Sequence, residues 1–394
     1  MSRPAGSSKL LRVMNESAAF AHLLDPGNLT RADLRRLTAL STPTISEVLR
    51  RLTVAGLISV VGYNSGRPGP NAEIYSANPD AAWTVAISVR DVGASHAPSL
   101  AASVSDLTGT VRARFESHID FLQTDPVDAI ADVVAQLRTE MYAPADRIRQ
   151  VQLGVAGSYD AKSEIIHHVE VPGFGRTGLV PEIAARLGTR VDVDNDVNLA
   201  AVAERRRGVG READGFALLW LGADGLGLAI DIGGTLMRGA RGGAGEIGYM
   251  PLYAPDSASH SKIALQDLVG GAAVLTLAGE HGIPGATPTE AVASAAADPP
   301  RHATFFTQLA DRVSVGLAAV IAVLDPTMVV LAGEVAQAGG EPLREAVAAA
   351  MGRNAPLQAA IELTALHEDA VLLGAQDAGL TTIRETLLAR ISDT

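Results

Sequence analysis

Val191-Asp192-Val193-Asp194-Asn195-Asp196-Val197-Asn198 says more about the architecture of this 394-residue chain than any other segment. Residues 191–193 predict a strand, and the Ala-rich residues 197–206 predict the helix that follows it. Asp196 then lies just beyond the carboxyl end of the strand. Because ligands of open α/β sheets bind at such strand ends, the segment predicts an α/β fold together with a ligand site.

The rest of the chain continues this alternation of strands and helices. Further strands are predicted at residues 151–155, 216–221, 228–232 and 328–331, and helices at 125–141, 305–324 and 341–351. Residues 1–80 instead predict short helices and a hairpin. Asn78-Pro79-Asp80 separates the two regions, because proline stops a helix before the apolar run 83–89. We therefore expect a small head over residues 1–80 and an α/β body over residues 81–394.

The composition restricts the kinds of function that the chain can have. With 47% hydrophobic and 19% charged residues it is typical of globular proteins. No uninterrupted apolar run reaches the ~18 residues of a membrane span, and the N-terminus lacks a signal-peptide core, so we expect a cytoplasmic protein without membrane contact. Cysteine is absent, which excludes disulfides, thiolate metal sites and cysteine nucleophiles.

The charge is distributed unevenly. The chain has a formal net charge of −12, yet residues 1–80 hold nine Lys or Arg against six Asp or Glu. The head therefore has a surplus of three positive charges and the body a net charge of −15. An acidic body is repelled by phosphates, so only the head is expected to meet a polyanion.

The head has the pattern of a winged helix-turn-helix. Thr30-Arg31-Ala32-Asp33 predicts a capped helix start, and Ser41-Thr42-Pro43 predicts a second one shortly after it. The second helix carries a buried apolar stripe until Ala55-Gly56 ends it. Strands are predicted at 57–62 and 72–75, joined by a Gly/Pro turn at 64–70. This order of elements predicts a double-stranded DNA operator as partner.

The side chains that would contact DNA lie off the buried stripe or on the wing. Small hydroxyls can approach base edges, and arginines can hold phosphates or guanine. The candidate DNA-binding residues are Thr44, Ser46, Arg50 and Arg51 on the second helix and Arg67 at the wing tip. The alternative is a helical packing or dimerisation module whose arginines are merely solvated.

Five motifs of the body resemble those of the ROK family, named for repressors, open reading frames and kinases. In chain order they are Gly154-Val155-Ala156-Gly157, Asp194-Asn195-Asp196-Val197-Asn198, Gly225-Leu226-Gly227, Ala244-Gly245-Glu246-Ile247-Gly248 and Leu331-Ala332-Gly333-Glu334. The winged head with Gly66-Arg67-Pro68-Gly69-Pro70 resembles that of ROK transcriptional regulators, which the ROK sugar kinases lack. The resemblance covers essentially the whole chain.

The resemblance implies an actin-like ATPase fold of two lobes, with a sugar bound in the cleft between them. It makes Asn195, Asp196, Glu246 and Gly157 the candidate effector-binding residues. In the kinases the residue matching Asp196 is the general base, and the one matching Glu246 binds sugar hydroxyls. The alternative is that Asp196 only caps the helix after it and Glu246 pairs with an internal arginine.

Departures from the family pattern concern the phosphate loops. Kinases open the body with Asp-x-Gly-Gly-Thr, where this chain has Ser88-Val89-Arg90-Asp91-Val92-Gly93. A string of that form occurs at residues 231–235, after Asp196 instead of before it, and we interpret it as a hairpin turn. Asp224 precedes the second Gly motif where the family has Thr, and its carboxylate would repel phosphates. Residues 331–334 resemble the adenosine motif, which a packing turn explains equally well. We therefore expect no kinase activity and no cofactor.

The family's zinc loop is missing too. The position of its histidine is Tyr249, and residues 254–270 contain no cysteine. His260 and His281 lie nearby without a paired carboxylate pattern, so no metal site is expected.

These observations predict a carbohydrate-responsive transcriptional regulator, a repressor, that binds an operator as a homodimer or homotetramer. Two alternatives from other classes stay open. One is an active ROK sugar kinase with a regulatory head, and the other is a regulator whose sugar pocket is vestigial.

Overall fold

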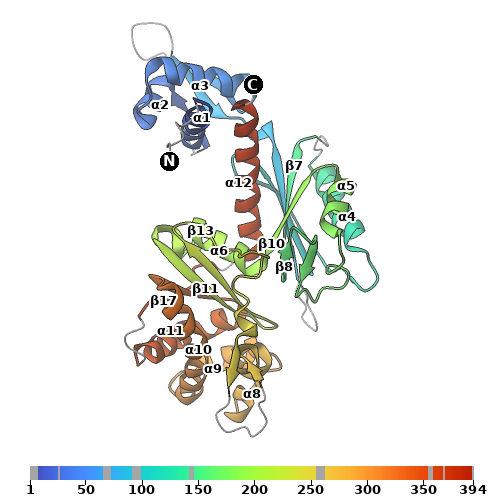
Figure 1. Ribbon diagram of the computed structural model, residues 1–394, viewed down its shortest axis with the longest axis vertical. Coiled ribbons are helices and arrows are strands. Elements are labelled where there is room, and N and C mark those ends of the chain that lie inside the picture. The colour runs from blue at the N-terminus through green and yellow to red at the C-terminus, as the bar shows by residue number, and fades with distance from the viewer. Residues whose placement is uncertain are drawn as a thin grey trace, which may run out of the picture. The chain divides into compact units, whose positions relative to one another are not determined.

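The computed structural model describes residues 8–24, 27–64, 72–90, 99–141, 146–253, 262–353, 358–366 and 369–392. The chain forms two compact units. Unit 1 comprises Met1–Leu153, Leu179–Val193 and Ala375–Thr394, and unit 2 comprises Gly154–Gly178 and Asp194–Gly374. The fold is mixed α/β in both units, as predicted (Figure 1).

The N-terminal head lies in unit 1. It consists of α1 (Ser8–Leu24), β1 (Leu29–Thr30), α2 (Arg31–Thr38), α3 (Thr42–Val54), β2 (Ile58–Asn64) and β3 (Ala72–Ala77). Thr30 and Asp33 form the capping box, since Oγ1 of Thr30 accepts from the Asp33 amide at 3.3 Å and Oδ2 of Asp33 from the Thr30 amide at 3.1 Å. Ser41 caps α3, and Pro43 stands in its first turn. The strands pair in the order β1-β3-β2.

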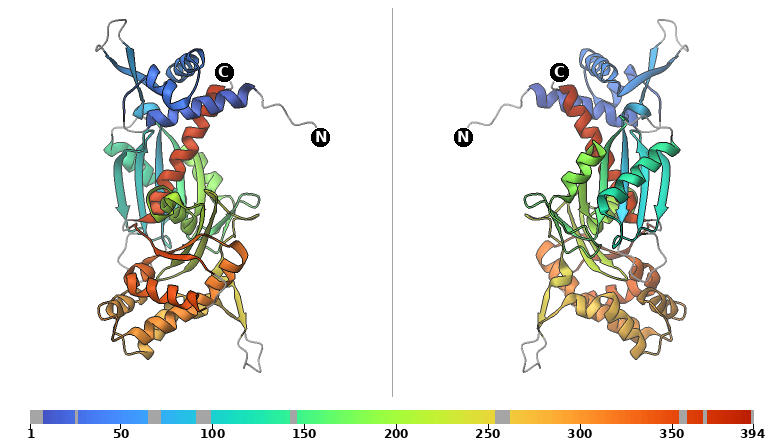
Figure 2. Two further views of the ribbon diagram at one scale, coloured as in Figure 1. Left: turned by 90° about the vertical axis from the view of Figure 1, so that its left-hand side faces the viewer. Right: turned by 90° about the vertical axis from the view of Figure 1, so that its right-hand side faces the viewer.

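The rest of unit 1 is built on a five-stranded sheet of order β10-β7-β4-β5-β6. Its strands are β4 (Trp83–Val89), β5 (Leu100–Asp106), β6 (Val111–Ser117), β7 (Ile148–Val155) and β10 (Arg190–Asn195). Helices α4 (Pro126–Glu140) and α5 (Leu179–Leu187) cover one face, and α12 (Ala370–Ser392) lies on the other (Figures 1 and 2). Gln376 of α12 donates to the Ser103 hydroxyl at 2.7 Å, which ties the helix to β5.

Unit 2 is built on a second sheet, of order β13-β12-β11-β16-β17. The strands are β11 (Gly215–Leu221), β12 (Leu226–Ile232), β13 (Thr235–Leu236), β16 (Met328–Ala332) and β17 (Ala360–Leu363). On one face pack α7 (Leu265–Val269), α8 (Gly271–Glu280), α9 (Pro288–Ala296), α10 (Ala303–Leu324) and α11 (Glu334–Gly352). The opposite face receives α6 (Asp196–Arg207) and the start of α12. The smaller elements of unit 2 are β8 (Ser158–Asp160), β9 (Ile165–His167), η2 (Val209–Glu212), η3 (Ile247–Tyr249), β14 (Pro251–Tyr253) and β15 (Lys262–Ala264).

Helix α10 is long and apolar enough to cross a membrane by length and composition alone, and within the described ranges no second helix is. Its buried residues, Phe305 and Leu317 among them, belong to the core of unit 2. The helix is therefore explained by packing against α7, α8 and α11.

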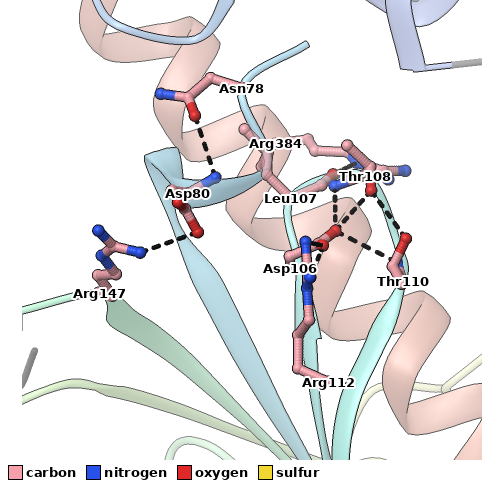
Figure 3. A network of polar contacts seen from close by, with 9 residues as sticks. All are labelled: Asn78, Asp80, Asp106, Leu107, Thr108, Thr110, Arg112, Arg147 and Arg384. Atoms are coloured by element: carbon pink, nitrogen blue, oxygen red, sulfur yellow. Dashed lines mark hydrogen bonds and ion pairs between the residues drawn. The ribbon is translucent and has the colours of Figure 1, made fainter. Parts of the chain in front are cut away.

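The connection between head and body is held by hydrogen bonds on three segments of unit 1 (Figure 3). In the linker, Asn78 donates to the Gly56 carbonyl at 2.9 Å and accepts from the Asp80 amide at 3.1 Å. The β5–β6 turn meets this linker, because the Leu107 amide donates to the Pro79 carbonyl at 3.2 Å. Arg384 of α12 donates to the Leu107 carbonyl at 2.8 Å. The predicted boundary at residue 80 lies inside η1 (Pro79–Ala81), and the division into a head domain and a two-lobed body domain stays a prediction.

Candidate effector and DNA-binding sites

The turn between β10 and α6 is fixed by its own side chains. Asn195 caps α6, because its Oδ1 accepts from the amides of Val197 at 2.9 Å and Asn198 at 3.2 Å. Asp194 supports the turn from behind, accepting from Nδ2 of Asn198 at 3.1 Å and from Arg238 at 2.9 and 2.6 Å. The sequence left open that Asp196 was the capping residue. In the structure this position belongs to Asn195, and Asp196 is the first residue of the helix.

Gly157 and Ser158 connect Asn195 with Glu246. Nδ2 of Asn195 donates to the Gly157 carbonyl at 3.3 Å, and the Ser158 hydroxyl hydrogen-bonds to Oε1 of Glu246. A Cβ atom on Gly157 would lie 2.9 Å from the His167 carbonyl oxygen, so only glycine fits against β9. Three predicted effector residues, Gly157, Asn195 and Glu246, are thereby linked directly or through Ser158.

Glu246 is set in place by the glycine before it. Gly245 has φ +94°, and a Cβ atom there would lie 1.8 Å from the Leu228 carbonyl oxygen. The Gly245 carbonyl in turn accepts from the Leu228 amide at 3.0 Å, which fastens the turn to β12. Among the described residues, the partner of the Glu246 carboxylate is Ser158 and not the internal arginine of the alternative interpretation.

Asp196 joins this cluster as an acid that is hard to ionise. Burial raises its pKa from 3.8 to about 7, and the neighbouring carboxylates of Glu334 and Glu246 add to the rise. A carboxyl group with this pKa exists partly in the protonated form at neutral pH. It can therefore donate a hydrogen bond as well as accept one, which suits a hydroxyl group as ligand.

Two aromatic rings beside the cluster escaped the sequence interpretation. The rings of His168 and Tyr249 are in tilted contact, with centroids 4.9 Å apart and an interplanar angle of 45°. The Tyr249 side chain is 63% exposed, and His168 has φ +58°, a conformation that non-glycine residues seldom adopt. In the sequence, Tyr249 stands out only as the residue at the position of the family's zinc ligand, and no sequence signal near residue 168 indicates a ring partner.

The segments that resemble nucleotide-binding loops of the family's kinases lie in turns between strands and helices. Residues 231–235 form the β12–β13 hairpin, as interpreted, with Gly233 at φ +58° and Gly234 at φ +80°. Asp231 is buried and pairs with Arg205, so its role is structural. Asp224 lies in the β11–β12 turn, and Glu334 begins α11 directly after Gly333 at φ +91°. Residues 91–93 lie outside the described part of the chain.

Among the described residues, no group of three His, Cys, Asp or Glu side chains is arranged to hold a metal. Nε2 of His281 lies 3.1 Å from Oε1 of Gln308, and its ring meets Phe305 edge-on at 6.0 Å. His281 is thus a packing residue, whereas His260 falls outside the described ranges.

Three of the predicted DNA-binding residues lie on α3 away from its buried stripe. Arg50 is 62% exposed and donates to Glu47 at 2.9 and 2.6 Å. Thr44 lies in the first turn of the helix, with its Oγ1 2.8 Å from the Ser41 hydroxyl. Ser46 accepts from Arg31 at 3.4 Å. Arg67 lies outside the described residues.

Arg51 departs from the prediction. Its side chain is only 13% exposed, its Nε lies 2.9 Å from Oε1 of the buried Glu16 on α1, and its Nη2 donates to the Ile391 carbonyl at the end of α12. Helical geometry turns Arg51 by ~100° from Arg50, which brings it to the inner side of α3. Arg51 therefore lies away from the exposed side of α3 that carries Arg50, which differs from the predicted placement of both arginines on one DNA-binding face.

Helix α2 supplies two cations that the sequence interpretation missed. Arg31 and Arg35 are exposed, and they bond to hydroxyls of α3: Arg31 to Ser46 at 3.4 Å and Arg35 to Thr42 at 3.2 Å. Their i, i+4 spacing puts both on one side of α2, which was the available signal.

Comparison with known proteins agrees with this architecture. The model of the ROK family matches residues 91–379. A xylose repressor from Caldicellulosiruptor bescii is 22% identical over 94% of this chain and 96% of its own length. The bifunctional enzyme NanE/NanK from Brucella suis is 33% identical over 50% of this chain, a match that spans 36% of the enzyme.

Solved structures extend the likeness to the fold. A ROK family transcriptional regulator, described as a homologue of the E. coli MLC protein, has a TM-score of 0.77 at 18% identity, covering 98% of this chain and all of the other. The ROK hexokinase from Thermus thermophilus has a TM-score of 0.61 at 24% identity and covers 77% of this chain and 99% of its own. The actin-like ATPase fold implied by the motifs is therefore confirmed.

Proposed function

This chain belongs to the ROK family, and from that premise we propose that it is a sequence-specific DNA-binding regulator, a repressor, of genes of carbohydrate metabolism. The observation that carries the proposal is the winged head in front of the family body. The repressor likeness spans nearly the full length of both chains, whereas the hexokinase likeness leaves about a quarter of this chain uncovered.

In this proposal α3 is the recognition helix. Thr44 and Ser46 approach base edges, Arg50 exchanges Glu47 for a phosphate or a guanine, and Arg31 and Arg35 hold the backbone from α2. Arg67 is proposed to reach the neighbouring groove from the wing. A homodimer or homotetramer in the cytoplasm would present two such heads to a near-palindromic operator.

The effector is proposed to be a sugar held by Asn195, Asp196 and Glu246, with Gly157 positioning the turn. The partly protonated Asp196 and the carboxylate of Glu246 offer both kinds of hydrogen-bonding partner to adjacent hydroxyls. Xylose, glucose and N-acetylmannosamine form a suitable first panel, because proteins similar to this chain include a xylose repressor, a glucokinase and a putative N-acetylmannosamine kinase.

We further propose that the protein has no kinase activity. Asp224 and Glu334 put carboxylates into the two loops that resemble the family's nucleotide loops, where they would repel phosphates. One observation favours the second candidate, a sugar kinase with a regulatory head: Asp196 matches the family base, and its pKa of about 7 suits proton transfer at neutral pH.

A pair of measurements tests the proposal. Selection from a random duplex library should enrich one near-palindromic sequence, and a coupled ADP-release assay with the sugar panel should give no turnover. Enrichment of no sequence, together with turnover that Asp196→Asn abolishes, would replace the regulator by the kinase. A selected operator without calorimetric binding of any sugar would favour a vestigial effector site.

A further inference from the structure

Arg51 joins two helices of the head to the C-terminal helix α12, which is remote from them in the sequence. It belongs to α3, its Nε is 2.9 Å from the carboxylate of Glu16 on α1, and its Nη2 donates to the Ile391 carbonyl on α12. Glu16 is only 1% exposed, so the ion pair with Arg51 offsets part of the cost of burying its carboxylate. The Ile391 carbonyl belongs to the last turn of α12, where backbone carbonyls commonly take partners from outside the helix, and here it accepts from Arg51.

The end of α12 also completes the hydrophobic core of the head. One buried cluster contains Phe20 of α1, Leu34 of α2 and the stripe of α3 together with four residues of α12. Those four are Ile383, Leu387, Leu388 and Ile391. Because a helix-turn-helix this small buries little apolar surface by itself, the last three turns of α12 form part of what holds α3 in its orientation.

A second fastening lies lower on α12. Leu107, at the tip of the β5–β6 turn, is fully buried in the same cluster, and its carbonyl accepts from Nη2 of Arg384 at 2.8 Å and from Nε at 3.1 Å (Figure 3). Asp106 stiffens this turn by accepting from the amides of Thr108 at 2.9 Å and Thr110 at 3.2 Å. The last part of α12 is therefore held in register with the head by two separate guanidinium groups.

The other end of α12 packs on α6 within unit 2. A Cβ atom on Gly374 would lie 1.7 Å from the Leu199 carbonyl oxygen, so the two helices touch at their backbones. Ala370 shares a buried cluster with Val197 and Ala200 of α6. Helix α6 begins at Asn195 and Asp196, the candidate effector residues. One continuous helix thus contacts the helix of the effector site at its start and the recognition helix at its end.

We propose that Arg51 is a positioning residue that couples α12 to the recognition helix, so that DNA affinity follows the position of α12 without any contact between Arg51 and DNA. This inference rests on the proposed function. It assigns α12 as the element through which an event at the start of α6 reaches α3, and Arg51 as its last connection.

The salt dependence of DNA binding separates positioning from phosphate contact. Full-length Arg51→Met and Arg50→Met are compared with the wild type on the duplex that the wild type selects, between about 50 and 200 mM salt. Arg51→Met should weaken binding about tenfold or more with an unchanged salt slope, and Arg50→Met should lower the slope by about one. A slope lowered by Arg51→Met, or an unchanged affinity, overturns the inference.

Hydrogen exchange tests the coupling without DNA, so it remains decisive even if no duplex is selected and the proposed function fails. Arg51→Met should speed amide exchange both in α3 and in residues 387–392, whereas Arg50→Met should change neither. Should Arg51→Met not fold, Arg51→Lys serves instead, since it keeps a cation beside Glu16 but loses the planar fork that also reaches Ile391. Faster exchange in α3 alone contradicts the coupling.

Substitutions near the start of α12 provide an independent test of the coupling. Gly374→Ala forces α12 away from Leu199, whereas Gly352→Ala, at the end of α11, adds a methyl group that meets nothing within 4 Å. Gly374→Ala should alter exchange in α3 and shift DNA affinity roughly threefold or more, and Gly352→Ala should leave both unchanged. Identical behaviour of the two variants in both measurements shows that α12 does not carry the signal.

Discussion

Ser158 hydrogen-bonds through its hydroxyl to the carboxylate of Glu246, a residue that follows it by 88 positions in the chain. The neighbouring Gly157 carbonyl accepts from Asn195. Gly157 and Ser158, at the start of β8, therefore connect the motif of Asn195 with the motif of Glu246, which is remote from it in the sequence. Hydrogen bonding to Ser158 holds Glu246 in one orientation. In the effector site proposed above, a carboxylate held in this way before the ligand arrives would lower the entropic cost of binding.

Gly157→Ala should displace β8 from β9. The added Cβ atom would lie 2.9 Å from both the His167 carbonyl oxygen and Cγ2 of Ile166, so the strands must separate. We expect a loss of about 1–3 kcal/mol in the free energy of unfolding, measured by urea denaturation. Gly279→Ala, where the new methyl group meets nothing within 4 Å, is the matched control and should not destabilise. Equal stability of both variants would show that the hairpin can shift freely.

Asp196→Asn should change how stability depends on pH. The pKa of Asp196 is raised from 3.8 to about 7 in the folded protein, so the folded state holds a proton that the unfolded state has released over this interval. The contribution of this group is fully present below pH 3.8 and is lost as the pH rises toward 7. Asparagine mimics the protonated acid, so the variant should gain stability relative to the wild type by up to about 1.4 kcal/mol per pH unit. Thermal denaturation from pH 4 to 8 measures this difference, and parallel curves would mean that Asp196 is ionised throughout.

Arg31→Ala and Arg35→Ala should each weaken DNA binding without changing which sequence is preferred. Both guanidinium groups are exposed on α2 beside hydroxyls of α3, where phosphates of a bound duplex would lie. Each replacement should lower the salt slope by about one in a fluorescence anisotropy titration. Arg190→Ala on β10, where the arginine is 55% exposed and paired with Asp192, is the control. Slopes equal to that of the control would remove α2 from the interface.

Tyr249→Ala should reduce sugar affinity, whereas Tyr249→Phe should retain it. The rings of His168 and Tyr249 are in tilted contact, and the Tyr249 amide donates to the Glu246 carbonyl at 3.2 Å. In the proposed site these rings would offer an apolar surface to the carbon face of a sugar. We expect a loss of about fivefold or more, in line with ~1 kcal/mol for an aromatic contact. Isothermal titration with the sugar that binds the wild type provides the measurement. Equal affinity of the alanine variant would exclude the rings from the site.

Local sequence patterns predicted those features that depend on residues close together in the chain. Thr30 and Asp33, or Gly233 and Gly234, satisfy backbone groups within three or four positions, so capping boxes and hairpins can be read without knowing the fold. The same holds for the strand and helix on either side of Asp196, because their hydrophobic periodicity is local as well. Membership in the family follows from motifs of this kind.

The part that sequence could not supply is illustrated by Arg50 and Arg51. The two are adjacent and chemically identical, yet one is exposed beside Glu47 and the other is buried between Glu16 and the end of α12. The difference depends on Ile391, which follows Arg51 by 340 positions, and no local pattern carries that distance. The linkage of Asn195 to Glu246 through Gly157 and Ser158 has the same origin. The sequence by itself determined the elements and the chemical groups, because both depend on neighbouring residues. Tertiary packing alone decided which group meets solvent and which meets another group, because burial is a property of segments brought together across the whole chain.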